Sequence, residues 1–371
     1  MNVINILYDF CFMAALLFVG KIIRAKFGFI QKLYIPSALI AGFLGLILGH
    51  QFLNIIPFSN EISFYSGILI SVLFGSMFLG TKRNVSFTKM ISSVGDTFLV
   101  NGASEIAQFG IFIFIGVTLL PNIFRELNNA FGLMLPAGFV GGHGTAAAIG
   151  SVLAEAGWDE AISIGQTFAT IGLLGGIIIG ISMINIGVRK GYTKIIKNIK
   201  DIPEDMRTGL IPAYKRTSFG DNTVNAMSID PLTWHACLIL IAVGGAYFVN
   251  NGLKILFPQI SFPVYGLALL CSIFIQKILG YLKVDEYIDK KIIIHIGSSA
   301  TDFLVAFGVA AINVSIVLKY AIPITILLIL GFVLVIGWFL LVSPRFFLTY
   351  WFERGIYIFG MSTGVLATGV I

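Results

Sequence analysis

Apolar runs of about 20 residues recur along nearly the whole sequence, and they limit the folds that this chain can adopt. The hydrocarbon core of a bilayer is about 30 Å thick, which a helix crosses with about 20 mostly apolar residues. Only 11% of the residues are charged and 57% are hydrophobic, whereas a soluble domain carries about 25% charged residues. The sequence therefore predicts an all-α integral membrane protein, because helices satisfy their own backbone hydrogen bonds within lipid and the alternating pattern of a β-barrel is absent.

Nine apolar segments have the length and composition of membrane-spanning helices. The first lacks a basic preceding region and a cleavage site of small residues, so we expect an uncleaved membrane helix. Two further apolar stretches, 130–153 and 355–371, are interrupted by glycines, and we expect both to be re-entrant loops, because irregular backbone at membrane depth must be surrounded by protein or water. The nine predicted spans are 4–20, 35–50, 64–80, 95–120, 161–187, 232–250, 262–280, 292–314 and 320–342.

The apolar segments fall into two halves that resemble one another. A polar stretch, 189–230, separates residues 1–188 from residues 231–371, and in each half a helix that begins at a proline, Pro36 or Pro263, precedes a glycine-broken loop. Five spans precede the polar stretch, so the second half must be inverted relative to the first. We therefore predict two inverted-topology repeats of about five transmembrane helices, which is typical of transporters, joined by a cytoplasmic linker.

The positions of the basic residues predict the orientation of the chain. The net charge is +6, and the Lys and Arg residues are spread over short loops and the polar stretch, which argues against a nucleic-acid partner. With the N-terminus outside, nearly all of them lie in cytoplasmic loops, as the positive-inside rule requires. We therefore predict a multi-pass protein with its N-terminus outside.

The first glycine-broken loop is the strongest candidate for a binding site. It contains Gly141, Gly142, His143, Gly144 and Thr145, followed by an alanine-rich run that favours a helix. Small residues let a ligand approach the backbone, and the first amides of the helix would face an anion such as a carboxylate. The alternative is close packing of helices through small residues. For the histidine three roles stay open: substrate binding, proton transfer or capping of the backbone. No second ligand at metal-binding spacing accompanies it, so no metal other than sodium is predicted.

The second loop offers two hydroxyl groups, those of Ser362 and Thr363, beside Gly364. Hydroxyls and freed carbonyls suit a hard cation, whereas the alternative is back-bonding within an ordinary helix. Polar side chains within spans usually face the bundle interior. From that set we assign Gln108, Gln166 and Thr170 to the substrate, and Asn101 and Asp302 to sodium, with a neutral carboxyl bonded to a neighbouring helix as the alternative for Asp302.

At GGHGTAAA the sequence resembles the bacterial sodium/glutamate symporters. The similarity extends through IPSALIAG, FGSMFLGTKRN, Gln108, the linker and the second glycine-rich loop. The resemblance implies two inverted five-helix repeats with re-entrant loops from opposite faces, sodium-coupled glutamate uptake without another cofactor, and a homodimer with elevator-like motion in a bacterial cytoplasmic (inner) membrane. Relatives continue through one more helix, so we expect this chain to be truncated within its second loop at Ile371.

We therefore predict a secondary active transporter rather than an enzyme. It would couple uptake of a small carboxylate, with glutamate as the first candidate, to sodium by alternating access. A sodium- or proton-coupled carrier of another organic anion is the main alternative. A channel needs a continuous pore with filter loops. A membrane-embedded enzyme needs clustered acids or a metal constellation, whereas Glu105 and Asp302 are isolated in the sequence. A scaffold without transport is the last alternative.

Overall fold

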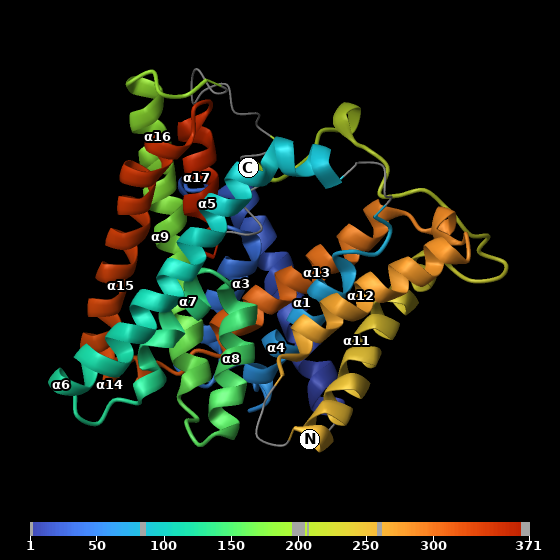
Figure 1. Cartoon of the computed structure of the whole chain (residues 1–371). Helices are drawn as coiled ribbons and strands as arrows, with labels where there is room; N and C mark the ends of the chain where they lie inside the picture. The colour runs from blue at the N-terminus through green and yellow to red at the C-terminus, as the bar shows by residue number, and fades with distance from the viewer. Residues whose placement is uncertain (1–2, 82–86, 195–204, 206–207, 258–261, 365–371) are drawn as a thin grey trace. The chain divides into compact units, whose positions relative to one another are not determined.

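A computed structural model describes residues 3–81, 87–194, 205, 208–257 and 262–364 (Figure 1). Throughout these ranges the regular structure is helical, as the sequence predicts. The helices before the linker are α1 (Val3–Lys26), α2 (Gly28–Lys32), α3 (Ser37–Leu48), α4 (Ile62–Ser76), α5 (Phe87–Phe114), the π-helical turn η1 (Ile115–Leu119), α6 (Leu120–Ile123), the 3₁₀ turn η2 (Asn129–Leu133), α7 (Met134–Phe139), α8 (Gly142–Glu155) and α9 (Ala161–Arg189).

The second half of the chain is also helical in its described residues. Its elements are the 3₁₀ turn η4 (Ala213–Lys215), α11 (Pro231–Leu256), α12 (Val264–Tyr281), the 3₁₀ turn η5 (Asp285–Tyr287), α13 (Lys290–Ala310), α14 (Val314–Lys319), α15 (Ala321–Gly337), the π-helical turn η6 (Trp338–Val342), α16 (Ser343–Phe346) and α17 (Trp351–Met361).

Each of the nine predicted spans contains a helix, and among the described residues seven helices are long and apolar enough to cross a membrane. The chain is therefore a multi-pass membrane protein. The other two helices are shorter than predicted: α3 has 12 residues and α4 has 15. At 1.5 Å per residue α3 is about 18 Å long. It begins after Pro36 in extended conformation and ends where Gly49 is extended, so its backbone leaves the helix at both ends.

The chain divides into two compact units. The larger consists of Met1–Ser63, Val85–Ile211 and Val305–Ile371, and the smaller of Phe64–Asn84 and Pro212–Leu304. In the smaller unit α11 packs along α12. Both units draw on both sequence halves, so the boundaries of the predicted repeats stay predictions. The core of the smaller unit comprises Leu79, Leu238, Ile239, Val243, Ile288 and Ile293.

The core of the larger unit surrounds α7, α8 and α9. Glycines let these helices lie close together: a Cβ at Gly138 would stand 2.6 Å from the backbone nitrogen of Ala169, and a Cβ at Gly150 would stand 2.7 Å from Cα of Ile162. At these two positions the glycines allow close helix packing. The buried cluster comprises Phe112, Leu120, Phe131, Met134, Leu135, Phe139, Trp158, Ala161, Ile164, Phe168, Ile324 and Leu327.

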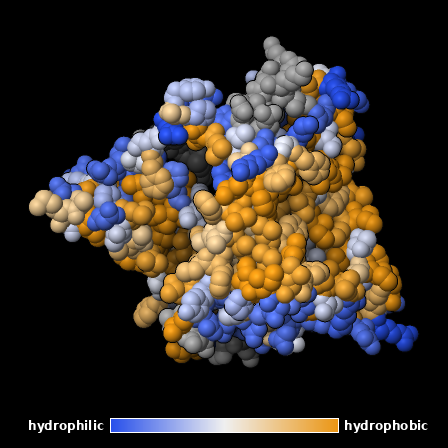
Figure 2. All heavy atoms as spheres, turned by 180° about the vertical axis from the view of Figure 1, so that it is seen from behind, coloured by the Kyte–Doolittle hydropathy of each residue, from blue (hydrophilic) through white to orange (hydrophobic). Residues whose placement is uncertain are grey.

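The outer surface of the larger unit is suited to lipid. Figure 2 shows hydrophobic residues across the middle of this unit and hydrophilic residues gathered towards two ends. Large apolar side chains on α5, among them Phe98 and Ile106, are about three-quarters exposed. On α15, Ile329 and Val333 are likewise exposed. An exposed apolar surface of this extent marks an interaction with lipid or protein.

The first glycine-broken stretch forms a helical hairpin. η2 and α7 lead to a turn at residues 140–141, and α8 leads back. α8 begins at Gly142, so the predicted loop is shorter than expected and His143 to Thr145 lie within the first helical turn. The hairpin starts and ends near the N-terminus of α9, where the rings of Phe131 and Trp158 are 6.2 Å apart.

The second glycine-broken stretch begins as a helix, α17, which ends in a turn at residues 362–364 (Figure 1). The remainder of this predicted loop, 365–371, lies outside the described residues. α17 starts near the C-terminal end of α9, where the rings of Trp351 and Tyr192 are 5.5 Å apart. α9 has 29 residues and is therefore about 43 Å long, so the first hairpin and α17 start at opposite ends of the same helix.

Candidate binding site at the meeting of two glycine turns

The turn of the first hairpin and the turn after α17 meet within the larger unit. Gly142 and Gly364 have φ angles of +63° and +83°, a region that favours glycine. A Cβ at Gly142 would stand 3.7 Å from the carbonyl oxygen of Gly364. A Cβ at Gly364 would in turn stand 3.3 Å from the carbonyl oxygens of Gly138 and Phe139. Backbone therefore faces backbone at this point, without a side chain between.

The N-terminus of α8 lies at this meeting point. Its N-cap residue is Gly141, and in the described part of the chain no side chain caps the helix. The first N–H groups of a helix have no partner within the helix, and they form the positive end of its dipole. Thr145 packs over Gly141, because a Cβ at that glycine would stand 2.1 Å from Cβ of the threonine. The helix end is thus a candidate site for an anion.

The C-terminus of α17 lies on the other side of the same point. Ser362 is its C-cap residue, and the N–H of Ser362 donates to the carbonyl oxygen of Ile358 at 2.9 Å. The hydroxyl of Thr363 donates to the carbonyl oxygen of Phe359 at 3.0 Å, so the predicted alternative of back-bonding applies to that residue. The C-terminal carbonyls are the negative end of the helix dipole, which favours a cation.

His143, Gln166 and Thr170 form one buried network. The hydroxyl of Thr170 donates to the carbonyl oxygen of Gln166 at 2.8 Å. Its oxygen lies 2.9 Å from Nε2 of His143 and therefore accepts from that nitrogen, which fixes the Nε2–H tautomer when the ring is neutral. Nε2 of Gln166 donates to the carbonyl oxygen of His143 at 3.1 Å. The side chain of His143 is only 3% exposed, and burial without an ionic partner favours a neutral ring.

A second polar group lies where α5 meets the end of α17. The hydroxyl oxygens of Ser104 and Ser362 are 3.1 Å apart, and Nε2 of Gln108 lies 3.4 Å from the carbonyl oxygen of Ser362. Within the described part of the larger unit, three buried amide oxygens have no hydrogen-bond partner: Oδ1 of Asn101, Oε1 of Gln108 and Oε1 of Gln166. An unpaired buried acceptor costs free energy, so each of these oxygens is available to a ligand.

The predicted site residues are not all brought together. Asp302 lies in the smaller unit, on an exposed part of α13. Asn101 is partly buried and donates from Nδ2 to Oε1 of Glu105 at 2.6 Å. The other predicted residues belong to the larger unit and lie on α5, α8, α9, the turn before α8 or the turn after α17.

Sequence reasoning assigned no role to two residues that border the site, Ser104 and Gly308. A Cβ at Gly308 would stand 2.6 Å from Oε1 of Gln166 and 2.8 Å from Cδ2 of His143. The sequence pattern that could have indicated Gly308 is the run of small residues after Phe303, which is similar to the run after Phe74 in the first half. A run of small residues predicts close packing, but it does not predict which residues pack against it.

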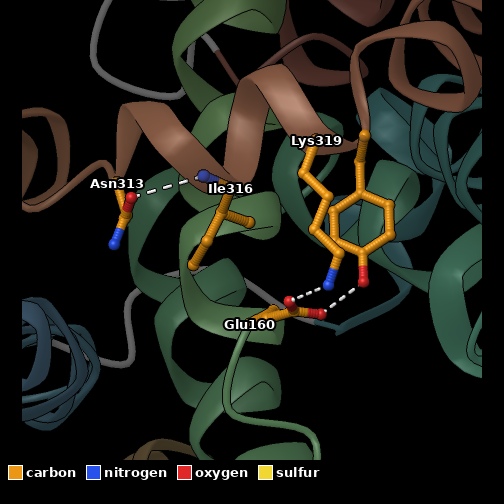
Figure 3. Close-up of polar contacts among 5 residues, drawn as sticks. Glu160, Asn313, Ile316 and Lys319 are labelled. Carbon is orange, nitrogen blue, oxygen red and sulfur yellow. Dashed lines mark hydrogen bonds and ion pairs between the residues drawn. The ribbon is translucent and has the colours of Figure 1, made fainter.

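A polar cluster at the N-terminal end of α9 joins that helix to α14 and α15 (Figure 3). Lys319 donates to Oε1 of Glu160 at 2.7 Å, and the hydroxyl of Tyr320 donates to Oε2 at 2.5 Å. Partial burial raises the pKa of Glu160, but the hydrogen bonds from Lys319 and Tyr320 outweigh it and hold that pKa below its usual range.

The other end of α14 is held by the same helix. The side chain of Asn313 caps α14 by accepting from the N–H groups of Ser315 and Ile316 at 3.0 and 3.3 Å (Figure 3). Its backbone N–H donates to the hydroxyl of Ser163 on α9 at 2.8 Å. α14 is therefore attached to α9 at both of its ends.

The chain was compared with known families and proteins. A family model described as sodium/glutamate symporter matches residues 2–348. A comparison with curated proteins finds no match. Among the described residues no group of three His, Cys, Asp or Glu side chains could hold a metal ion.

Proposed function

Because the chain belongs to the sodium/glutamate symporter family, we propose that glutamate and sodium bind where its two glycine turns meet. The family supports sodium-coupled transport of glutamate and implies a transporter rather than an enzyme. The observation that carries the proposal is the approach of two helix ends of opposite polarity, the N-terminus of α8 and the C-terminus of α17, at Gly142 and Gly364. One end suits a carboxylate and the other suits a cation.

Glutamate would be held mainly by backbone. The first N–H groups of α8, from Gly141 to Thr145, would donate to one carboxylate, as anions bind at helix N-termini. The network of His143, Gln166 and Thr170 lies against the same turn, and the unpaired Oε1 of Gln166 offers an acceptor for the amino group. The sequence prediction adds Gln108 to these substrate-binding residues.

Sodium would lie at the end of α17. Ser362, Thr363 and Gly364 offer hydroxyl and carbonyl oxygens there, and Asn101 adds an unpaired amide oxygen from α5. Helix C-termini and unwound carbonyls coordinate sodium in transporters with broken helices. Asp302 stays a candidate on the smaller unit.

The transport cycle that we propose is alternating access by an elevator-like movement. The first hairpin and α17 start at opposite ends of α9, which supports two inverted repeats with re-entrant segments from opposite faces of the membrane. We further propose a homodimer in a bacterial cytoplasmic membrane, with the N-terminus outside.

Uptake by purified protein in proteoliposomes tests the function. Labelled glutamate should accumulate when sodium is high outside and low inside, and should not accumulate when choline replaces sodium. Aspartate and a dicarboxylate without an amino group, added as competitors, would separate glutamate from another organic anion as the preferred substrate. Accumulation without a sodium gradient, or none with it, would contradict sodium-coupled glutamate transport.

A further inference from the structure

We propose that Ser104, Gln108 and Ser362 are ligands of one sodium ion, which lies between α5 and the end of α17. This inference rests on the proposed function and changes one assignment within it: Gln108 would bind the cation rather than glutamate.

The three side chains are buried, and their oxygen atoms lie close to one another. Gln108, Ser362 and Ser104 are 0%, 1% and 3% exposed. The hydroxyl oxygens of Ser104 and Ser362 are 3.1 Å apart. Oxygens that ligate a hard cation of this size at about 2.3–2.6 Å lie roughly 3–3.5 Å from one another in a six-coordinate shell. Both hydroxyls can therefore ligate the same ion once their protons turn away from it.

Gln108 is better explained by a cation than by its present contacts. Its Nε2 lies 3.4 Å from the carbonyl oxygen of Ser362, which is long for a hydrogen bond. Its Oε1 is buried and has no partner among the described residues. Rotation about the last side-chain bond exchanges the two ends of the amide, because that torsion is broad and roughly two-fold. Oε1 and the carbonyl oxygen of Ser362 would then face one ion.

The local charge also favours a cation here. The C-terminus of α17 is the negative end of a helix dipole. On α5 the carboxylate of Glu105 lies one residue from Ser104 and is held by Nδ2 of Asn101 at 2.6 Å. A glutamate carboxylate placed against Gln108 would meet the negative end of the α17 dipole. The positive end of α8, in contrast, offers that carboxylate unpaired N–H groups.

The test separates sodium affinity from glutamate affinity. Thermal stabilisation of the purified protein is titrated with sodium chloride, and with choline chloride at matched ionic strength, without glutamate. Ser104→Ala and Gln108→Leu should each raise the half-maximal sodium concentration about tenfold or more, as expected when one ligand is lost. At saturating sodium, glutamate affinity should stay within about twofold, because excess sodium restores the cation-bound state.

Two variants serve as controls. Ser104→Thr keeps the hydroxyl and should keep most of the sodium response. Ser182→Ala removes an exposed hydroxyl that bonds only to the carbonyl oxygen of Ile178 on its own helix, and it should leave both affinities unchanged. A loss of glutamate affinity in Gln108→Leu that saturating sodium does not restore would return this residue to the substrate. An unchanged sodium titration in Ser104→Ala would overturn the site. If the native protein neither responds to sodium nor binds glutamate, the proposed function itself fails.

Discussion

At the scale of single residues, the backbone conformation of Gly142 predicts that a substitution there is strained, although the space around the residue would admit a Cβ. Its φ is +63°, whereas a Cβ there would meet only ordinary contacts. Gly142→Ala would therefore strain the first turn of α8 by about 1–2 kcal/mol without steric overlap. If the N–H groups of that turn hold glutamate, a small reorientation should raise its dissociation constant about tenfold or more, since one charge-assisted hydrogen bond contributes about 1.5–3 kcal/mol. Isothermal titration at saturating sodium measures this constant.

The matched control is Gly157→Ala at the other end of α8. Gly157 has a φ of +96°, and a Cβ there would lie in open space. The same kind of backbone strain is thus introduced away from the turn. Glutamate affinity should be unchanged in this control. If both variants lost glutamate affinity equally, the loss would be due to a less stable α8 and not to a lost contact with glutamate.

Gly308 allows a steric test of the same site. A Cβ at this position would stand 2.6 Å from Oε1 of Gln166 and 3.0 Å from Cβ of His143. Gly308→Ala should therefore displace the buried amide and weaken glutamate binding, with little effect on the sodium titration. Gly110→Ala, on a helix with nothing within 4 Å of the added carbon, should be neutral or slightly stabilising. Wild-type glutamate affinity in Gly308→Ala would show that Gln166 does not contact the substrate.

At the scale of elements, the attachment of α14 to α9 predicts a pH dependence. Because the pKa of Glu160 is lowered by its partners, its contribution to stability is present above the ordinary carboxylate range and is lost as pH falls through the folded-state pKa. Glu160→Gln should lower Tm by at most about 2 °C at pH 7, since the pair is partly exposed. The difference from the native protein should shrink below the ordinary carboxylate range and vanish once pH is below the folded-state pKa of Glu160.

The control for this pH series is Glu126→Gln, which removes an exposed carboxylate. It should show no difference that disappears with acid. A Tm difference between Glu160→Gln and the native protein that stays constant as pH falls from 7 through the folded-state pKa of Glu160 would contradict a role for the charge of this residue.

The helices were predictable because an apolar run of sufficient length indicates a segment that crosses the membrane. The start of α8 was not, because sequence alone does not reveal that only Gly142 among the clustered glycines takes a positive φ. The residues of the candidate site were predictable in part, because side chains with hydroxyl or amide groups are rare within apolar runs. Their pairing was not, since Ser104 and Ser362 are 258 residues apart and no local pattern encodes such a contact. Asp302 was assigned from its rarity too, yet it lies on the other unit.

At the scale of the whole molecule, orientation is the prediction that most depends on sequence. With the N-terminus outside, the linker is cytoplasmic. A cysteine at the exposed Ser218, in a background without the three native cysteines, should resist an impermeant thiol reagent in intact cells and react in inside-out vesicles. A cysteine at the exposed Lys254 should behave in the opposite way. Labelling of position 218 from outside would reverse the orientation and remove the basis for the inverted repeats.

The burial of His143 has an electrical consequence. A charge fixed on the protein that moves through the membrane field in one half of the transport cycle moves back in the other half. Only the transported solutes and any exchanged protons therefore contribute to the steady transport current. His143 is only 3% exposed and has no ionic partner among the described residues, which disfavours a charged ring, so we expect no proton to be exchanged there. Glutamate carries one net negative charge, and n sodium ions then move n − 1 charges per cycle, each worth about 2.3 kcal/mol per 100 mV. The ratio of current to glutamate flux across a voltage-clamped bilayer should therefore be an integer that pH does not change.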